Sequence, residues 1–572
     1  MAIFYSANRD ATSVGIRFRS SRWYMPLVAG LLLSLLGQID AGAAVIKAAS
    51  PLRSDVSAAI ALASDGDTVI VPAGTASWTQ TLNITKGITL QGQTTTDPVA
   101  GTANDQTIIL DDVVAAPYPG YRIAITLAPS AGQTIRVSGF TFRTGSTTDR
   151  GYQGSVNIAG TTQATAVRVD HCHFDGLQAQ ARQISIQSAV YGVIDHNILN
   201  LTPPNVSNSF FLQMGNWGNN TDGMGDGSWA EPAYFGSEKF IFFEDNYINN
   251  PTSNVLNGDT DDNKGARWVF RHNHCYNMLV ENHGTETGRI RSSRAREIYN
   301  NDFHWTIPTF SVAGNRGGGL IAHDNTYDGV KPAFGYTFQD YRVFLAFNGR
   351  GGPFYGATGD SGWDVNVTES DGVTHVDGHS PYLFQSGTLT GATSDVNAGT
   401  QTLTDTSKTW VTNHWVGYTA KRISDNEVGL ILSNTSNALT VAWHTSQGLL
   451  FASGDQYQIH KVLIALDQPC RGQGDLISGA TPTAAWPHQA LEPCYSWNNI
   501  YTPDGTHLNI SPSNVNPPQL LVAGRDFYND TPMPGYTPYT YPHPLVGGAT
   551  PTPTPTPAPS PAAPTNLRIT GP

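Results

Sequence analysis

A short pattern of apolar and polar positions recurs along the chain between residues 169 and 501. In each copy a short strand ends, the chain turns on a residue that is usually Asn, and an apolar or aromatic residue follows two positions later. The turn residues are Cys172, Asn197, Asn246, Asn273, Asn301, Asn325 and Asn499. Apart from one double gap and the long gap before Asn499, they recur about every 25 residues, which is typical of a solenoid. Because the repeats are rich in β-branched and aromatic residues and lack helical periodicity, the pattern predicts an all-β solenoid.

The recurring Asn residues have a structural explanation. Asn tolerates left-handed backbone geometry at a turn and bonds local backbone groups. Amides stacked coil upon coil can also bond one another in a ladder. We therefore expect these residues to line one edge of the solenoid, and we assign them no catalytic role.

Counting back from each turn residue predicts which side chains face the core. The residues three and five positions earlier give these inward pairs: Val167 with Val169, Ile241 with Phe243, Trp268 with Phe270, and Leu320 with Ala322. In one coil the pair is Arg296 with Ile298, so an arginine occupies an apolar position. A buried, unpaired guanidinium is very costly. We expect Arg296 to pair with a carboxylate such as Glu297 or Glu286, unless a bulge displaces it.

The N-terminal part of the chain carries a family resemblance. The stretch DVSAAIALASDGDTVIVPAG (55–74), followed by LNITKGITLQG (82–92) and VSGFTF (137–142), resembles the opening of parallel β-helix proteins of the pectate-lyase-like superfamily. The resemblance implies a right-handed parallel β-helix whose first coil is capped by a short amphipathic helix, with Val56, Ala59, Ile60 and Ala63 as its buried face. This superfamily hosts lyases, hydrolases, esterases and non-catalytic stalks, so the function must come from the site residues.

The chain divides into segments of different character. We expect the β-helix to span 45–385 and 463–548, interrupted at 386–462 by a small inserted β domain of alternating short strands and tight turns. Residues 549–564 form a Pro/Thr-rich linker of the polyproline type. Residues 565–572 look like the first strand of a fibronectin type III module, so we expect a truncated multidomain protein.

The N-terminus and the composition bear on location and partners. Residues 1–44 have basic residues, an apolar stretch and small residues in the order of a secretory signal, with a signal anchor as the alternative. We expect a secreted or cell-surface protein without a membrane span after processing, because no later apolar run is long enough. Acids outnumber bases 45 to 32, giving a net charge of -13, which argues against nucleic acid as a partner. We expect a monomer.

The four cysteines permit limited pairing. Cys470 and Cys494 could close a loop of about 25 residues, stabilising the fold by about 3 kcal/mol if oxidised without strain. Cys172 and Cys275 lie several coils apart and should not be bonded to each other. We expect Cys275 to be a small buried hydrophobic residue.

An arginine cluster marks the candidate site. Arg289, Arg291, Arg294 and Arg296 fall within residues 289–296 of a chain in which 13% of residues are charged. Arg289 and Arg291 flank Ile290 and would share one face of a strand. Equal offsets from neighbouring turn residues give polar groups in the two adjacent coils, so the three coils could form a groove. Those groups are Asp261, Asp262, Lys264, Asn315 and Arg316.

β-Elimination on a uronic-acid polysaccharide would use such a groove. A lyase must neutralise the uronate carboxylate, remove the adjacent proton and support the developing enolate. We assign catalytic roles to Lys264, His283, Arg289 and Arg291, and substrate binding to Arg294, Asn315, Arg316, Trp268 and Trp305. Hard oxygen ligands for Ca²⁺ would be Asp259, Asp261, Asp262 and Glu286. The arrangement is similar to that of the calcium-assisted β-helix lyases that act on chondroitin-type polymers and alginate.

Two other functions stay open. The Asp cluster followed by His283-Gly and an arginine faintly resembles polygalacturonase-type hydrolases, in which two of Asp259, Asp261 and Asp262 would act as acid and base while His283 and Arg291 bind substrate. A non-catalytic carbohydrate-binding or cell-surface protein is the third possibility, favoured by the inserted domain and the tail. The products formed from a panel of uronate polymers would separate the three.

Overall fold

The computed structural model of the chain describes the greater part of residues 43–547. The described ranges are 43–113, 125–128, 130, 132–146, 155–159, 164–176, 182–187, 190–200, 210–215, 225–229, 231–251, 259–282, 291–339, 383–396, 398–416, 419–424, 428–442, 451–460, 467–472, 492–512, 521 and 523–547. The expected signal segment, the Pro/Thr-rich linker and the fibronectin-like start lie outside these residues.

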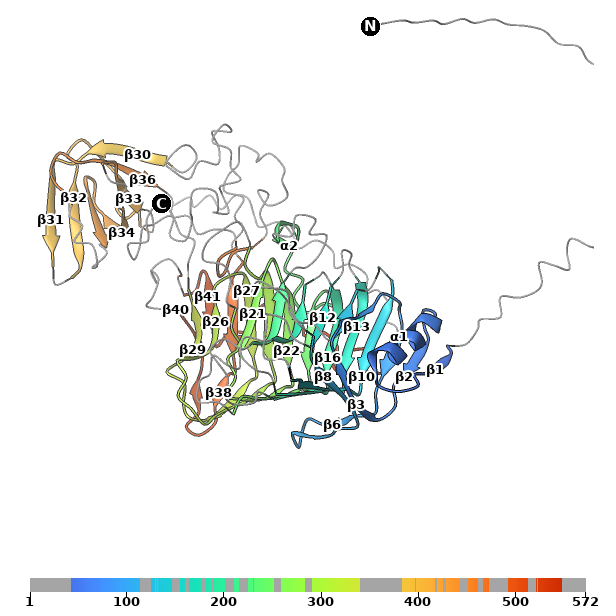
Figure 1. Cartoon of the computed structure of the whole chain (residues 1–572). Helices are drawn as coiled ribbons and strands as arrows, with labels where there is room; N and C mark the ends of the chain where they lie inside the picture. Colours follow the sequence, from blue (N-terminus) through green and yellow to red (C-terminus); the bar gives the residue numbers. More distant parts are fainter. Residues whose placement is uncertain are drawn as a thin grey trace, which may run out of the picture. The chain divides into compact units, whose positions relative to one another are not determined.

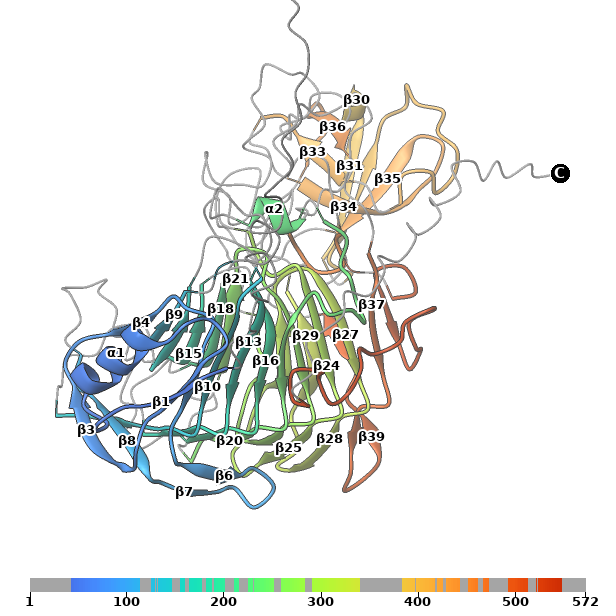
Figure 2. The same cartoon turned by 90° about the vertical axis from the view of Figure 1, so that its right-hand side faces the viewer.

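The main body is a right-handed parallel β-helix with three faces (Figures 1 and 2). The first sheet stacks twelve parallel strands: β1 (Val45–Lys47), β2 (Thr68–Ile70), β5 (Thr89–Gln91), β10 (Thr134–Ser138), β13 (Ala164–Asp170), β16 (Val190–Asp195), β19 (Ile241–Glu244), β22 (Arg267–Arg271), β24 (Ala295–Tyr299), β27 (Gly319–His323), β37 (Cys494–Trp497) and β41 (Phe527–Asn529).

The second sheet forms the next face of each coil and is parallel except for its last pair. Its strands are β3 (Gly74–Trp78), β8 (Thr107–Asp111), β11 (Thr141–Thr144), β14 (His173–Asp175), β17 (Ile198–Asn200), β20 (Tyr247–Asn249), β23 (His274–Tyr276), β25 (Asp302–Trp305), β28 (Thr326–Gly329), β38 (Ile500–Tyr501) and β39 (Thr506–His507). A hairpin of β6 (Thr95–Asp97) and β7 (Thr102–Asn104) precedes β8.

The third face is built in two parts. Its first part is β4 (Leu82–Ile84), β9 (Ile125–Leu127), β12 (Val156–Ile158), β15 (Arg182–Ile186), β18 (Phe210–Gly215) and β21 (Asp259–Asn263). Its second part is β26 (Ser311–Asn315), β29 (Phe334–Phe338) and β40 (Ile510–Pro512). Residues 279–282 join the two, because Thr260 N–H donates to Leu279 O (3.2 Å) and Asn282 pairs with Asn315. Together these elements form what we call the third face.

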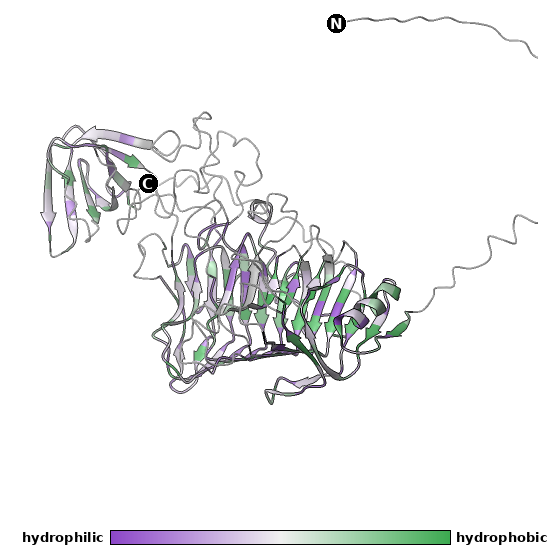
Figure 3. Cartoon of the chain, in the orientation of Figure 1, coloured by the Kyte–Doolittle hydropathy of each residue, from purple (hydrophilic) through white to green (hydrophobic). Residues whose placement is uncertain are grey.

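The predicted inward register is confirmed. All four expected apolar pairs are buried in one continuous core, and hydrophobic and hydrophilic segments alternate along the strands (Figure 3). Helix α1 (Arg53–Leu62) contacts the first strands and buries Val56, Ala59 and Ile60, as the resemblance implied. Ala63, at the C-cap of the helix, is buried as well.

The Asn ladder is also confirmed. Asn197, Asn246, Asn273, Asn301 and Asn325 each donate from Nδ2 to the Oδ1 of the next Asn, ending on Asn499, at 2.7–3.0 Å. The expected left-handed conformation, however, falls on the residue before each ladder position. These left-handed residues are His171, His196, Asp245, His272, Asn300, Asp324 and Asn498. The ladder amide is therefore selected for its hydrogen bonds, while its neighbour makes the turn.

Arg296 is buried as predicted, but Glu297, one of its two predicted partners, does not pair with it. Glu297 follows it in β24, so the two side chains face opposite sides of the sheet. The Arg296 guanidinium instead lies over the Trp268 ring, 5.6 Å from its centroid, and donates through Nη2 to Gly314 O (3.2 Å). Its Nε and Nη1 have no hydrogen-bond partner, and burial lowers its pKa. Glu286, the other expected partner, lies outside the described residues.

The outer side of the first sheet is covered by residues 536–546, which follow the last strand of that sheet. Arg271 pairs with Glu244 (2.6 Å) and donates to Tyr539 O and Thr540 O, while Arg168 donates to Leu545 O. Glu297 accepts from Gly236 N–H (2.7 Å) and Tyr536 O–H (2.5 Å). This face of the β-helix is thus a second buried layer containing paired charges.

Residues 383–460 carry a separate antiparallel sheet. Its strands are β30 (Leu383–Thr388), β31 (Gly391–Asp395), β32 (Thr400–Thr404), β33 (Thr419–Arg422), β34 (Val428–Asn434), β35 (Ala438–Ala442) and β36 (Gln456–His460). Leu403, Ile431, Leu439, Val441 and Ile459 form the centre of its own core. The described cysteines Cys172, Cys275, Cys470 and Cys494 are all free thiols, and Cys275 is buried as expected.

Candidate functional site

The outer side of the third face carries adjacent carboxylates at the position where the sequence placed the site. Thr260 bonds the backbone of residues 279–281, through its N–H to Leu279 O and its hydroxyl to Glu281 O (2.6 Å). This register sets Asp261 beside Glu281, about 4.8 Å apart along the stack of coils. Val280 and Asn282 are fully buried, so Glu281, between them, faces outward.

Asp262 belongs to the interior, and its prediction as a calcium ligand is wrong. Its Oδ2 accepts a hydrogen bond from Trp268 Nε1 (2.6 Å), and the carboxyl is fully buried. Burial raises the pKa of Asp262 to about 6, with the Arg296 charge opposing that rise. Because successive side chains of a strand face opposite sides, Asp261 and Asp262 cannot bind one ion or one substrate together.

Glu281 was not predicted as a site residue from the sequence. It forms a charged group with Arg316. Arg316 Nη2 lies 3.7 Å from Glu281 Oε1, and its Nε donates to Gln339 Oε1 (3.0 Å). Glu281 lies over Gly314, where a Cβ would come 2.8 Å from the carboxylate oxygen, so the glycine makes room for it. The Arg316 and Glu281 side chains are 15% and 13% exposed, enough for solvent or a ligand to reach them.

Lys264 occupies an unusual backbone position directly after β21. It begins the turn after β21 with φ +53°. Most of the other described non-glycine residues in this conformation are Asn, Asp or His. Its N–H donates to Arg291 O (2.7 Å), and helix α2 (Asp226–Trp229) packs behind it through the Ser228 hydroxyl, which donates to Gly265 O. A lysine rarely adopts this conformation, so the surrounding bonds must hold it there.

Besides Arg296, two more of the clustered arginines are buried. Arg294 is fully buried, donates to both carboxylate oxygens of Glu492 and lies over the Trp229 ring, 5.1 Å from its centroid. Trp229 Nε1 in turn donates to Ser292 O (3.0 Å). Arg291 is also fully buried, so the prediction that it acts in catalysis in a groove between the coils is wrong. The cause is α2 and Glu492, which cover this coil from distant parts of the chain.

The expected substrate-binding aromatics lie inside the β-helix. Trp268 is fully buried against Phe243 and Phe270, and Trp305 stacks on Phe303 and donates to Met278 O. Asn315 is fully buried too. None of these three side chains can contact a polysaccharide, so these predictions are wrong. The remaining predicted residues, His283, Glu286 and Arg289, lie outside the described residues, as does the side chain of Asp259.

The oxygen atoms available to a cation on the third face come from two described carboxylates, of which Asp261 is 6% exposed. Ca²⁺ takes six to eight oxygen ligands, and the outer face offers the Asp261 and Glu281 carboxylates. Among the described residues, the group that brings three ligand atoms within 4.8 Å of one another lies elsewhere and consists of Asp105, His173 and Asp175. Arg143 already pairs with both of its aspartates. That group is therefore satisfied without a metal.

Comparison with known proteins gives similarity of fold alone. No protein-family model matches the chain, and no curated protein matches it. Among solved structures, an arginine-to-alanine mutant of AlyGC, an alginate lyase of the PL6 family, is 14% identical with a TM-score of 0.29, over 52% of this chain and 40% of that one. An alginate lyase from Paenibacillus sp. is 12% identical with a TM-score of 0.27, over 51% of this chain and 97% of that one.

None of the helices in the described part of the chain has the length and apolarity needed to cross a membrane.

Proposed function

We propose that this chain is an exported polysaccharide lyase that cleaves a uronic-acid-containing polymer by β-elimination on the outer side of the third face. The observation that carries the proposal is the set of charged groups on neighbouring coils of the third face: Lys264 at a left-handed turn after β21, and the Arg316–Glu281 pair. Stacked coils repeat a position about every 4.8 Å, which matches a site that follows an extended polymer.

The proposed chemistry assigns one task to each group. Arg316 binds the uronate carboxylate and stabilises the negative charge that develops on it. Lys264 removes the proton from the ring carbon next to that carboxylate. As the carbon–oxygen bond to the leaving sugar breaks, a ring double bond forms and the departing oxygen takes up a proton. The products are a new chain end and an unsaturated uronide.

Ca²⁺ is proposed as an aid to this reaction. Asp261 and Glu281 would hold it, together with oxygen ligands from the substrate or from parts of the chain outside the described residues. When bound, the ion would neutralise the substrate carboxylate. If it serves this role, a chelator will reduce cleavage and added Ca²⁺ will restore it.

Hydrolysis by paired aspartates needs two carboxyl groups facing one sugar. Asp262 faces the interior, which excludes it from such a pair. The pair would have to be Asp259 with Asp261, and the side chain of Asp259 lies outside the described residues. A carbohydrate-binding protein without catalysis stays an outcome of the test.

The test is a panel of uronate polymers incubated with the purified chain. Ultraviolet absorbance of an unsaturated product, formed together with reducing ends, supports the lyase. Reducing ends without absorbance would indicate a hydrolase, and binding without either product would indicate a binding protein.

Variants locate the activity. Lys264→Asn keeps a residue that tolerates left-handed geometry, and Arg316→Gln keeps a hydrogen-bonding side chain. Each should lower kcat/KM by about a hundredfold or more. Lys331→Gln is the matched control, because Lys331 is a cation paired with Asp504 elsewhere on the β-helix. Full activity in both site variants would contradict the proposal.

A further inference from the structure

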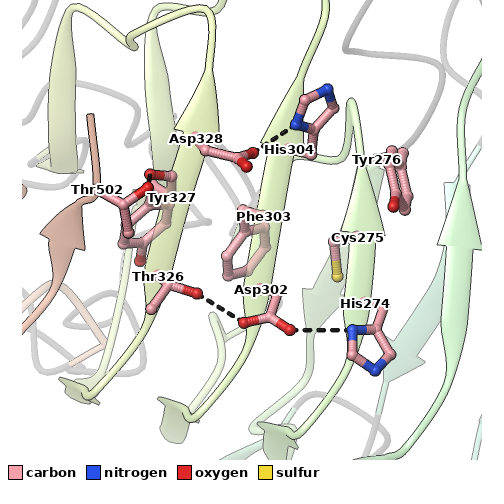
Figure 4. Close-up of a pocket in the computed structure, with 10 residues that line it drawn as sticks. All are labelled: His274, Cys275, Tyr276, Asp302, Phe303, His304, Thr326, Tyr327, Asp328 and Thr502. Atoms are coloured by element: carbon pink, nitrogen blue, oxygen red, sulfur yellow. Dashed lines mark hydrogen bonds and ion pairs between the residues drawn. The ribbon is translucent and has the colours of Figure 1, made fainter. Parts of the chain in front are cut away.

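A hollow of about 330 Å³ lies on the outer side of the second sheet, away from the third face. Three adjacent strands, β23, β25 and β28, form its floor, and Thr502 adds one edge. Figure 4 shows its polar side chains on neighbouring strands, directed toward one another. The hollow is on the lower edge of the volume range typical of small-molecule sites.

Two histidine–aspartate pairs cross the strands of this hollow. Asp302 lies 3.0 Å from His274 Nδ1 and accepts a hydrogen bond from the Thr326 hydroxyl (2.6 Å). Asp328 lies 2.5 Å from His304 Nδ1 (Figure 4). The two aspartate side chains are 63% and 53% exposed, so each keeps accessible oxygen while a neighbouring strand fixes its orientation.

A tyrosine lies next to these pairs. The Tyr276 ring is half-buried, with its centroid 5.4 Å from that of His304 and 5.2 Å from that of Tyr247. Contacts on both sides fix the ring without hiding it. The hollow therefore combines an aromatic surface with carboxylate acceptors and imidazole groups at fixed positions.

The charged groups that line the hollow favour an uncharged ligand over an anionic one. Its lining holds two carboxylates, each balanced at most by one imidazole, and no lysine or arginine. A uronate would meet negative charge here, whereas hydroxyl groups can donate to carboxylates and a sugar ring can pack on tyrosine. The described ligand atoms that come close enough for a metal belong to Asp105, His173 and Asp175, outside this hollow.

We infer that this hollow is a binding site for uncharged sugar units, separate from the proposed cleavage site. Asp302 and Asp328 accept hydrogen bonds from neighbouring hydroxyls, His274 and His304 hold these carboxylates in place, and Tyr276 packs against the ring. Such a site would attach the protein to a neutral polysaccharide or to the neutral units of a mixed one. It does not depend on the function proposed for the third face.

Binding to the full chain tests this inference. The probes are neutral tetrasaccharides of glucose, mannose and galactose, together with a uronate tetrasaccharide, measured by titration calorimetry and ligand-observed NMR. At least one neutral probe should bind, and more tightly than the uronate. Asp302→Asn and Tyr276→Ala should each weaken that binding about tenfold.

A matched control is available on the same sheet. His507 pairs with Asp530 (2.6 Å) outside the hollow, so His507→Ala removes an equivalent pair and should leave binding unchanged. Melting temperatures near that of the parent show that the variants are folded. The inference is overturned if no neutral probe binds, if the uronate binds equally well, or if His507→Ala weakens binding as much as Asp302→Asn. Uronate-polymer cleavage, measured on the same variants, should be unaffected and reports separately on the proposed lyase.

Discussion

Asp261 and Asp262 are neighbours in β21 but face opposite sides of the β-helix wall. Asp262 accepts a hydrogen bond from Trp268 in the core, whereas Asp261 lies on the outer side of the third face beside Glu281. One strand thus contributes a carboxylate to the proposed site and another to the interior, and the two can be separated by experiment.

Substituting each aspartate with Asn should affect different properties. Asp261→Asn should lower uronate cleavage and weaken its dependence on Ca²⁺, because a charged ligand oxygen is lost. Asp262→Asn should lower the free energy of unfolding by about 3 kcal/mol, because the buried Arg296 loses its opposite charge. Chemical denaturation and cleavage assays on both variants check this. If Asp262→Asn lost activity at unchanged stability, the assignment of the two faces would be reversed.

Arg296 and Asp262 should be energetically coupled. Each is the largest charge effect on the other's pKa, although no direct ion pair joins them. Arg296→Met, with a side chain that fills apolar space, should destabilise the parent but cost less when Asp262 is already Asn. A double-mutant cycle should therefore give a coupling of about 1–3 kcal/mol. If the two substitutions change the free energy of unfolding by strictly additive amounts, the two charges do not interact across the core.

The β-helix could be predicted from the sequence because its two periodicities are local. The spacing of the Asn residues predicts the coils, and strand alternation then predicts that Val167, Phe243 and Leu320 face inward. Both depend on residues within one coil. The left-handed turn position was missed because His, Asp and Asn all occur there, next to the more regular ladder Asn.

The candidate site was less predictable because it depends on distant segments. From the sequence, Arg294 was expected to bind substrate on the outer side. In the structure Glu492, which is 198 residues away, and Trp229 of α2 cover it. Counting back from the turn residues could not decide which of Asp261 and Asp262 faces outward, because the intervening turns vary in length. Glu281 lies in a four-residue stretch too short to show alternation. The signal that could have identified Glu281 as an outward-facing residue is its position between two inward-facing residues, Val280 and Asn282.

Glu297 should make stability depend on pH. Burial raises the pKa of Glu297 to about 7, above the ordinary 4.5, although Tyr536 and Gly236 donate hydrogen bonds to it. Between those values the folded protein retains a proton that the unfolded chain releases. The free energy of unfolding should therefore fall as pH rises from about 4.5 to 7, by up to about 3 kcal/mol.

Glu297→Gln removes this effect while keeping an oxygen that accepts from Gly236. Its stability relative to the parent should increase with pH across the same range, measured by urea denaturation at constant ionic strength. A difference that stays constant with pH would show that Glu297 is ionised in the folded protein.

Cys470 and Cys494 should form a disulfide when the protein folds under oxidising conditions. Both thiols are buried, and burial together with contact from Cys494 raises the pKa of Cys470 well above its ordinary value. Thiolates, not thiols, attack oxidants, so the folded protein should react slowly. During folding the thiols are accessible, and oxidised glutathione can take up the two electrons as the sulfur–sulfur bond forms and two protons leave.

The resulting loop should stabilise the fold by about 3 kcal/mol. Refolding with and without oxidised glutathione, followed by peptide mapping, should recover a linked Cys470–Cys494 peptide only in the oxidised sample, while Cys172 and Cys275 stay reduced as internal controls. If all four thiols remained free after oxidative refolding, the two sulfurs would not be positioned to bond.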